Sequence, residues 1–466
     1  MTEAVLTQAP DAPEVGRAGD AIGRRGADPR ASRYVELFDT TQRPAQPAWL
    51  SAFRRAGISR FDELGFPTTK NEDWHFTNIA PLAERKFSPA ALATEPIKST
   101  VTAADIEPFL FAGDWQTLVF VNGHFAPGLS HSDAVDDKLY VGRLVTAIND
   151  DARTRLVQNH LGGLSADHAH AFTALNSSFL QDGVLIAARG DTVAGRPIHV
   201  VFVTDRNADG VLVSPRNLIV LDHHAEATIV ESYVSIGETS HFTNAVTEMY
   251  IGEGARLRHY KIQRESAKAY HVGSSYAHQG RGSNYEAFSF ATGADLSRTN
   301  VATVLDGEGA HVTLNGLYMV DGEQLVDHQT RIEHAKESCT SHEIYKGVLD
   351  GDSHAVFNGQ VYVRPEAQKT DGKQSNNNLL LSSGARVDTK PQLEIYADDV
   401  KCTHGATIGR LDPTALFYLK SRGIGEETSR KLLTYAFAAE VLEELTVEAV
   451  REKLESLAFM RFAATA

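Results

Sequence analysis

The sequence predicts a mainly β protein whose core is a right-handed parallel β-helix, flanked by N-terminal and C-terminal α-helical domains. Two observations indicate this fold class. From residue 113 onward the chain consists of many short stretches rich in Val, Ile, Tyr and Thr, broken by Gly, Asp and Asn turns. Apolar residues at the helical spacing of three and four gather before and after this region.

An internal repeat favours a β-helix over other folds with short strands. Val304–Gly307 followed by Asn315–Val320 recurs as Val348–Gly351 followed by Asn358–Val363, at offsets of 44 and 43 residues. We interpret each offset as two stacked coils, which predicts coils of roughly 20 to 25 residues. A β-sandwich is the alternative architecture for such strands.

The N-terminal part divides into two segments. Residues 1–30 are rich in Ala, Gly, Asp, Arg and Pro and almost lack large apolar residues, so they predict a disordered tail. Residues 31–112 carry apolar residues at helical spacing, with Pro47 placed for a helix start, and predict a helical domain. We expect Trp74, near its end, to be a packed core aromatic.

The remaining chain divides at residue 410. Residues 113–410 predict the β-helix core, with one helix around 165–180. Residues 411–466 predict a C-terminal helical domain that starts at Asp412, a helix N-cap followed by proline. The second of its helices is apolar around most of its circumference, so we expect another surface to cover it.

Composition excludes several classes of protein. A formal charge of −15 disfavours nucleic acid as a partner. Two cysteines in 466 residues and the absence of an apolar leader favour the cytoplasm over secretion. No run of about 18 apolar residues occurs, so we expect no membrane span.

Enzyme signatures are mostly absent. The chain has no nucleotide-binding Gly-x-x-x-x-Gly-Lys-Ser/Thr loop, no Gly-x-Ser-x-Gly and no His-Glu-x-x-His. Asp350 and Asp352 could supply the paired carboxylates of a cytosolic carbohydrate-active β-helix enzyme, a lyase or hydrolase. Ordinary turn chemistry explains the same two residues.

Cys402 and His404 form the chain's Cys-x-His pair. Alternate residues of a strand point to one face, so both side chains would face the same way. A tetrahedral or cluster site needs about four ligands, and this pair could supply half of one. The alternative is a buried strand cysteine beside a hydrogen-bonded histidine. We expect Cys339 to be a small core residue.

Several motifs together resemble the SufB/SufD family of iron–sulfur cluster assembly proteins. The most specific stretch is Tyr396–Arg410 followed by Asp412–Ile424, and further matching stretches are Pro67–Asn78, Phe172–Phe179 and Ala367–Gln374. The resemblance implies a β-helix core with helical ends, working in a complex with a SufB-like sister subunit and a SufC-like ABC ATPase. It implies a scaffold rather than an enzyme.

One position distinguishes the two branches of this family. SufB-like chains carry a cysteine shortly before the strand that corresponds to Leu379–Leu381, and this sequence has Asn376 there. His404 matches a histidine that SufD-like members offer at the contact with SufB. The resemblance therefore implies a SufD-like subunit; a SufB-type scaffold is the alternative. It further implies that this chain alone binds no cofactor stably and that it shares a transient Fe–S cluster or iron with SufB. His404 is then the first candidate ligand, and Cys402 is a weaker one.

The resemblance also implies two contact surfaces. The ends of the β-helix would pair with the SufB-like subunit, or with a second copy when the chain is alone, by strand addition. The C-terminal helices would dock the ATPase through apolar and basic side chains, for which the candidates are Leu416, Phe417, Tyr418, Arg422, Leu432, Leu433 and Phe437.

Overall fold

A computed structural model of the chain describes five segments, residues 28–40, 46–90, 99–132, 138–166 and 170–463. Residues 1–27 of the predicted tail lie outside the described residues. Pro29 and Arg30, at its expected end, already belong to the first helix, α1, Pro29–Thr40.

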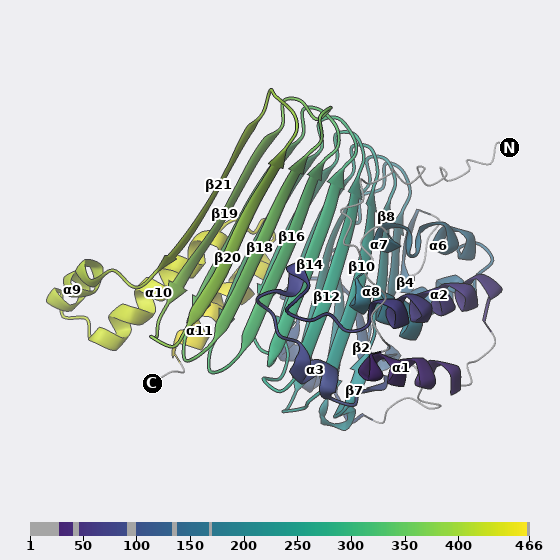
Figure 1. The fold of residues 1–466 in the computed structure, drawn as a ribbon, viewed down its shortest axis with the longest axis horizontal. Helices are drawn as coiled ribbons and strands as arrows, with labels where there is room; N and C mark the ends of the chain where they lie inside the picture. The colour runs from purple at the N-terminus through teal and green to yellow at the C-terminus, as the bar shows by residue number, and fades with distance from the viewer. Residues whose placement is uncertain (1–27, 41–45, 91–98, 133–137, 167–169, 464–466) are drawn as a thin grey trace.

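The core is a parallel β-solenoid made of two sheets, as the sequence predicted (Figure 1). Successive strands alternate between the sheets, so each coil contributes one strand to each. The order is β20-β18-β16-β14-β12-β10-β8-β5-β4 in sheet A and β21-β19-β17-β15-β13-β11-β9-β6-β2-β3 in sheet B. From β8 to β21 every pairing between coils is parallel and runs without a break in register.

The strands of the regular coils are eight to eleven residues long, apart from the shorter β8. Their bounds are β8 Arg216–Leu221, β9 Glu226–Ile236, β10 Phe242–Ile251, β11 Arg256–Arg264, β12 Tyr270–Gln279, β13 Asn284–Ala291, β14 Leu296–Leu305, β15 His311–Val320, β16 Leu325–His334, β17 Thr340–Leu349, β18 His354–Val363, β19 Asp371–Leu380, β20 Arg386–Ile395 and β21 Lys401–Gly409. Shorter strands precede them: β1 Ser88–Pro89, β2 Gln116–Val121, β3 His124–Phe125, β4 Leu139–Arg143, β5 Val184–Ala188, β6 Ile198–Asp205 and β7 Val211–Val213.

The predicted coil length is wrong. Successive strands of one sheet start 26 to 32 residues apart, so a coil is longer than the expected 20 to 25 residues. The positions of the repeated segments explain the difference. Val304–Gly307 spans the end of β14, in sheet A, and the turn after it, whereas Val348–Gly351 spans the end of β17, in sheet B, and the turn after it. The offset of 44 residues therefore spans three half-coils, because one strand and its turn form the repeating unit.

Alternation along the strands separates the inside of the solenoid from its outer faces. In β9 and β11, Ile229 and Leu257 point into the interior, which we call the lumen, and belong to one long apolar cluster. Their neighbours Val230 and Ile262 point outward into a second cluster. Both faces of these strands are buried, and both are consequently rich in apolar residues.

Helices from the first 180 residues cover the outer face of sheet A (Figure 1). These are α1, α2 Ala48–Leu64, η1 Glu72–Trp74, α3 Ala80–Glu84, α5 Leu144–Ile148, α6 Thr154–His160, α7 Gly163–Ala166 and α8 Ala171–Phe179. The short α4 Ala103–Ile106, η3 Glu107–Phe109 and η4 Pro127–Leu129 instead pack against strands of sheet B. The sequence predicted only one helix between residues 113 and 180. The four helices α5–α8 span four to nine residues each, too few turns for a periodic apolar pattern to show.

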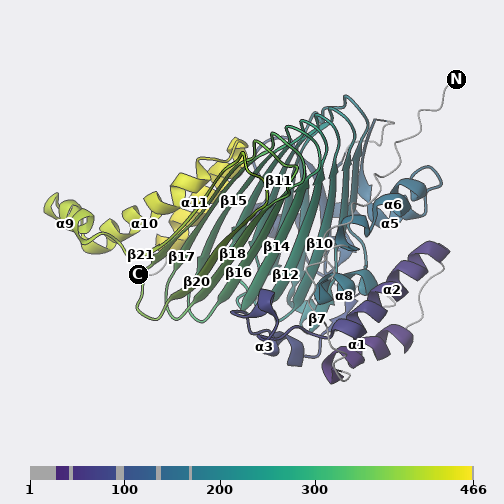
Figure 2. The ribbon, with the colours of Figure 1, turned by 45° about the horizontal axis from the view of Figure 1, so that its top comes forward.

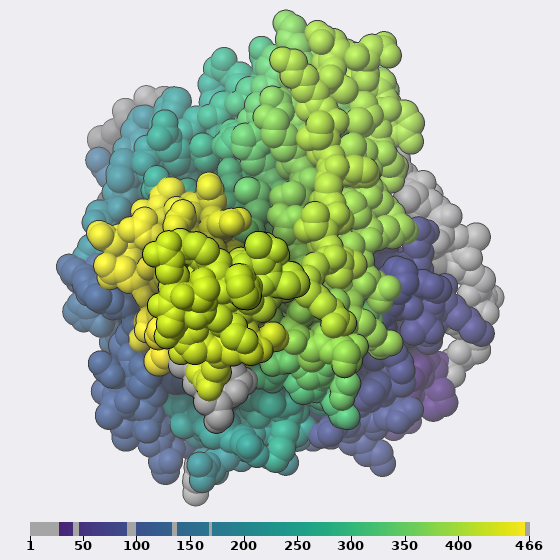
Figure 3. Space-filling view, turned by 90° about the vertical axis from the view of Figure 1, so that its left-hand side faces the viewer, coloured from purple at the N-terminus to yellow at the C-terminus, as the bar shows by residue number. Residues whose placement is uncertain are grey.

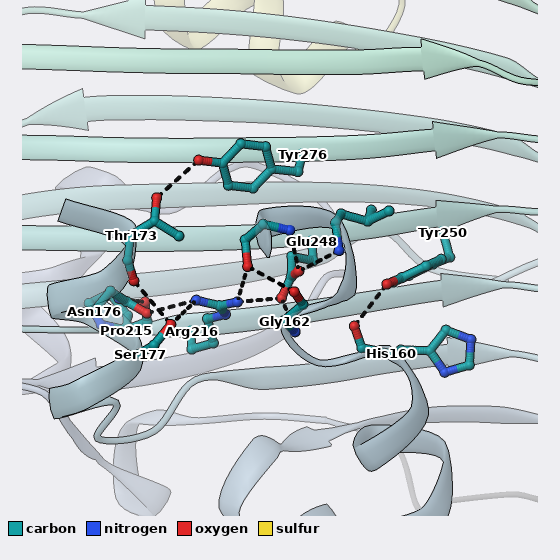
Figure 4. A network of polar contacts seen from close by, with 12 residues as sticks. His160, Gly162, Thr173, Asn176, Ser177, Pro215, Arg216, Glu248, Tyr250 and Tyr276 are labelled. Atoms are coloured by element: carbon teal, nitrogen blue, oxygen red, sulfur yellow. Dashed lines mark hydrogen bonds and ion pairs between the residues drawn. The ribbon is translucent and has the colours of Figure 1, made fainter. Parts of the chain in front are cut away.

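A buried ion pair fastens α7 and α8 to sheet A (Figure 4). Arg216 of β8 and Glu248 of β10 are fully buried and lie 2.5 Å apart. Glu248 also accepts from the backbone N–H groups of Gly162, Leu164 and Ser165 at 2.8 to 3.1 Å. Arg216 donates to Asn176 and Ser177 of α8 at 3.2 and 3.3 Å, although its Nε has no hydrogen-bond partner among the described residues. The pair thus connects both helices to sheet A.

Trp74 is a buried core aromatic, as expected, and anchors the segment around η1. The guanidinium of Arg298 in β14 lies over its ring at 3.7 Å from the centroid. Arg298 donates to the carbonyl of Asp73 and to the carboxylate of Asp327, each at 2.6 Å. These contacts attach a segment far away in sequence to the middle of sheet A.

The C-terminal helices are α9 Pro413–Ser421, α10 Glu426–Leu442 and α11 Glu448–Ala463. As predicted, α9 begins after Asp412, whose carboxylate accepts from the N–H of Thr414 at 2.9 Å. Helices α10 and α11 pack on the outer face of sheet B, opposite the N-terminal helices (Figure 2). In the described part of the chain, no helix combines the length and the hydropathy that crossing a membrane requires.

Candidate functional site at the terminal coil

The solenoid ends in two edge strands, β20 and β21. Within the described residues, each has a neighbour in its sheet on one side only. Apolar side chains on and beside them are partly exposed: Ile395 by 36%, Tyr396, directly after β20, by 57%, and Ile408 by 49%. Free backbone donors and acceptors beside exposed apolar side chains form an edge to which another strand can add.

Cys402 and His404 lie on β21, at this edge. Cys402 is the register partner of Gly372, and His404 is the register partner of Gln374, in β19. Gly372 and Gln374 are buried, and Cys402 packs against the interior residue Val361. Both side chains of the pair therefore stand on the lumen face, about 6.6 Å apart along the strand, as the alternation of a strand requires. Because no further coil follows, His404 is exposed.

The pair supplies two donors of different kinds. Burial raises the pKa of the half-buried Cys402 thiol, which disfavours the thiolate that binds metal. Imidazole binds iron in its neutral form. In the described part of the chain, no group of three or more His, Cys, Asp or Glu side chains could hold a metal ion. A complete site at this edge would need donors from a second molecule.

A polar column continues from His404 into the lumen. Gln374 and Glu343 occupy the same register position on β19 and β17. The side-chain amide of Gln374 donates to Glu343 at 2.6 Å. Burial raises the pKa of Glu343 to about 7, because the carboxylate has few groups to replace water. The second oxygen of Glu343 has no partner among the described residues.

A second polar chain runs beside this column. Asn376 is fully buried and donates to the hydroxyl of Tyr318 at 3.0 Å, and Asn378 donates to Asn376 at 2.6 Å. Asn378 also reaches the carbonyl of Thr407 on β21 at 3.5 Å. Asn376 is thus a buried structural amide in the lumen, connected by hydrogen bonds through Asn378 to the edge strand.

Sequence reasoning did not find this column. The run of amides in Gln374–Asn378, which directly precedes the apolar Leu379 and Leu380 in one strand, is a signal for a polar interior that the sequence analysis did not use. Glu343 carries no such signal, because a single acidic residue in a strand is usually solvated. Its burial depends on the coils stacked on both sides.

The predicted docking residues divide into two groups. Phe417 and Tyr418 of α9 are exposed by 74% and 56%, and Arg422 lies over the Tyr418 ring at 5.1 Å. No residue of α9 is buried, and the helix projects from the end of the solenoid (Figure 1). Figure 3 shows this helix and the terminal strands on one end of the molecule.

The other docking residues belong to α9 and α10, and the expected excess of apolar surface on α10 is reduced by sheet B. Ala438, Val441 and Leu442 are buried against the solenoid. Leu416, Leu433 and Phe437 are half-buried, and Leu432 is 39% exposed. Sheet B thus provides part of the cover expected for α10, and the exposed apolar side chains are concentrated on α9 and the start of α10.

The remaining candidates have local explanations. Cys339 is fully buried, and its thiol donates to the carbonyl of Gly307 at 3.2 Å, in agreement with a small core residue. Asp350 and Asp352 flank Gly351 in the turn after β17, where Gly351 adopts a φ of 64°. Asp350 accepts from the N–H of Gly351 at 2.9 Å. Turn chemistry accounts for the Asp350 carboxylate, and Asp352 occupies the same turn.

Comparison with known proteins gives a consistent picture. Residues 202–437 match the family model for the SufBD core domain of the SUF system for FeS cluster assembly, and residues 29–200 match the SufBD protein N-terminal region. The chain is 35% identical to the iron–sulfur cluster assembly protein SufD of Escherichia coli over 84% of its length and 88% of the relative. It is 32% identical to a SufBD family protein of Synechocystis, covering 86% and 88%, and 29% identical to SufD of Bacillus subtilis, covering 91% and 96%.

Proposed function

The chain belongs to the SufBD family of iron–sulfur cluster assembly proteins, and from this premise we propose that it is a non-catalytic, cytoplasmic scaffold subunit. It would build nascent clusters together with a SufB-like subunit and a SufC-like ABC ATPase. The observation that carries the proposal is the terminal coil, where Cys402 and His404 face an open lumen end on an unpaired edge. The family match favours this function over a carbohydrate-active enzyme, and relatives named SufD favour the SufD-like branch.

The edge of β20 and β21 is the proposed contact with the SufB-like subunit. Strand addition would satisfy its free backbone groups, and Ile395, Tyr396 and Ile408 would become buried. The rings of Tyr396 and Tyr362 lie 5.5 Å apart and present a continuous aromatic surface there. In the absence of that partner, the same edge could pair with a second copy of the chain.

The substrate of the proposed site is iron or a nascent cluster. His404 is the first ligand candidate because it is exposed at the edge, and Cys402 is second because burial disfavours its thiolate. The partner would contribute the remaining donors of the site. Neither residue would hold iron stably in the isolated chain.

Helix α9 is the proposed docking element for the ATPase. It presents Phe417, Tyr418 and Arg422 to solvent and buries none of its own residues. Exposed aromatic and arginine side chains are the residue types that dominate protein interfaces. Leu432 extends this surface onto α10.

The ligand role of His404 can be tested by cluster reconstitution with the purified partners. His404→Ala should leave the three-protein complex assembled, since one side chain seldom decides a large interface, yet reduce cluster formation at least about tenfold. Cys402→Ser should reduce it less. His342→Ala, a change at another exposed histidine of sheet B, is the matched control and should have no effect. Cluster formation by His404→Ala at the wild-type rate would contradict the proposal.

The docking role of α9 needs point substitutions. Deleting residues 411–466 would uncover the outer face of sheet B, because α10 and α11 pack on it. Phe417→Ser with Tyr418→Ser should abolish retention of the ATPase while leaving the melting temperature unchanged. Phe459→Ser, at an equally exposed aromatic of α11, should retain it. Undiminished retention by the double variant would place the contact elsewhere.

A further inference from the structure

A pocket with two cationic side chains lies between α11 and the outer face of sheet B. Its charged residues are Arg264, the last residue of β11, and Lys453 of α11. The other lining residues are Phe109, Phe111, Ser232, Val234, Ile262, Leu454 and Leu457. The empty space of about 230 Å³ at this pocket includes open solvent, so the pocket is a partly open depression and not an enclosed cavity. It lies five strand positions from β21, about 24 Å from the terminal coil.

Three elements bring the two cations together. Because Leu257 of β11 faces the lumen, the alternation of the strand turns Arg264 outward, next to Ile262 on the same outer face. The guanidinium of Arg264 lies over the ring of Phe109 in η3, at 5.1 Å from the centroid. Helix α11 is held on the same face by the buried Leu454, which places Lys453 at the rim. The cations are thus positioned by packed elements.

Neither cation has an ion-pair or hydrogen-bond partner among the described residues. Burial lowers the pKa of Arg264, and burial together with the charge of Arg264 lowers the pKa of Lys453. Glu107 acts in the opposite direction on Lys453 but forms no ion pair with it in the described part of the chain. The hydroxyl of Ser232 already forms a hydrogen bond with the His199 ring, at 2.8 Å. Two half-buried positive charges therefore remain unneutralised in a protein of net charge −15.

We propose that this pocket binds the phosphate group of a small organic phosphate, held between the Arg264 guanidinium and the Lys453 ammonium. A phosphate dianion balances two positive charges and offers separate oxygens to a planar guanidinium and to an ammonium. A carboxylate carries one charge and would leave the second cation unbalanced. The site is independent of the proposed cluster site.

The rest of the lining indicates the body of the ligand. Phe111, Leu454 and Leu457 form an apolar wall beside the cations. With the phosphate at the two cations, the remainder of the ligand would lie along this wall toward solvent. An apolar or aromatic body attached to the phosphate would gain contact area that inorganic phosphate cannot.

Calorimetric titration of the full-length protein at low ionic strength tests the proposal with two probes, phenyl phosphate and inorganic phosphate. We expect saturable binding of phenyl phosphate, at least about tenfold weaker in Arg264→Gln and in Lys453→Gln. Arg256→Gln, at an exposed arginine of the same strand, should bind like the wild type. Equal affinity for both probes would assign the site to the free anion; tighter binding of phenyl phosphate assigns it to an organic phosphate.

The thermal stability of the unliganded proteins separates a binding role from a structural one. Since the two cations repel each other, Lys453→Gln should melt at or above the wild-type temperature, whereas Arg264→Gln also loses the contact with Phe109. Phenyl phosphate should raise the melting temperature of the wild type alone. The absence of saturable binding to the wild type, unchanged affinity in both variants, or a clear loss of stability in unliganded Lys453→Gln would each overturn the proposal.

Discussion

Lys346 of β17 binds Phe437 of α10 in two ways: its ammonium lies 4.5 Å from the centre of the Phe437 ring and donates to the Phe437 carbonyl at 3.0 Å. The same ammonium pairs with Glu440. The Lys346 side chain is only 5% exposed, whereas that of Glu440 is 71% exposed, so the ion pair lies at the edge of the buried contact with Phe437. A predicted docking residue is thereby also an anchor that fixes α10 on the solenoid.

We expect Lys346→Met to loosen α10. The change removes a charge-assisted hydrogen bond and a cation–π contact, together about 1 to 3 kcal/mol of local stability. Hydrogen–deuterium exchange measured by mass spectrometry should show faster exchange in α10 and unchanged exchange in β17. Lys420→Met, which breaks an exposed ion pair with Glu426, is the control and should leave α10 unaffected. Unchanged exchange in α10 of Lys346→Met would show that apolar packing alone holds the helix.

Glu343 should make stability depend on pH near neutrality. Burial raises its pKa to about 7 from an ordinary 4.5, so the folded state binds the proton more tightly than the unfolded state. The stability that this proton contributes is complete below about pH 4.5 and is lost as pH rises through about 7. Glu343→Gln should therefore match the wild type at pH 5 and exceed it at pH 8.5, by at most roughly 3 kcal/mol.

Urea unfolding followed by circular dichroism at the two pH values measures this difference. Glu366→Gln, at an exposed position, should give the same difference from wild type at both pH values. If the gap between Glu343→Gln and wild type does not grow with pH, the carboxyl group is ionised at little cost in the folded protein.

Arg298 should be essential for attaching the segment that carries Trp74. Arg298→Gln leaves the buried Asp327 carboxylate without its ion-pair partner, which costs about 3 to 5 kcal/mol. Urea unfolding monitored by tryptophan fluorescence should shift to lower urea concentrations. Lys390→Gln removes an exposed ion pair to Glu72 in the same region and should cost less than about 1 kcal/mol. Similar losses in the two variants would argue against a special role for the buried pair.

The two cysteines should react at very different rates. Cys402 is half-buried at the edge strand, whereas Cys339 is fully buried. Iodoacetamide should label Cys402 first and Cys339 only after unfolding, as mass spectrometry of peptides would show. Because burial raises the pKa of Cys402, its labelling rate should keep rising about tenfold per pH unit up to at least pH 9. A plateau near pH 8 would indicate a thiolate stabilised by its surroundings.

The architecture could be predicted because its signals are local. Each element is determined by its own residues: the strands by β-branched residues, the turns by Gly and Asp, and the first C-terminal helix by Asp412 before Pro413. The family resemblance then indicated how these elements combine into one fold. The coil length could not be predicted, because the two copies of the repeat lie at the ends of β14 and β17, which belong to opposite sheets. A repeat read from one sequence does not reveal whether its copies stack directly or alternate.

The candidate site was predictable only on its exposed side. The alternation rule places Cys402 and His404 on one face from their spacing alone. Gln374 and Glu343 join them through the register of three strands that are about 30 residues apart in sequence, and their burial follows from coils above and below. The packing of α10 on sheet B could not be predicted for the same reason: Lys346 and its neighbours, which contact the helix, are far from it in sequence.

Because the repeating unit is half a coil, the number of units inserted into or deleted from this protein must be even if the fold is to be kept. Loss or gain of one strand-and-turn unit, a third of the 44-residue offset, would move every later strand to the opposite sheet. Helices α10 and α11 would then face the side already occupied by α1, α2 and α8, and Cys402 and His404 would stand on the other sheet. Insertions and deletions that keep both flanks covered must therefore come in even numbers of units.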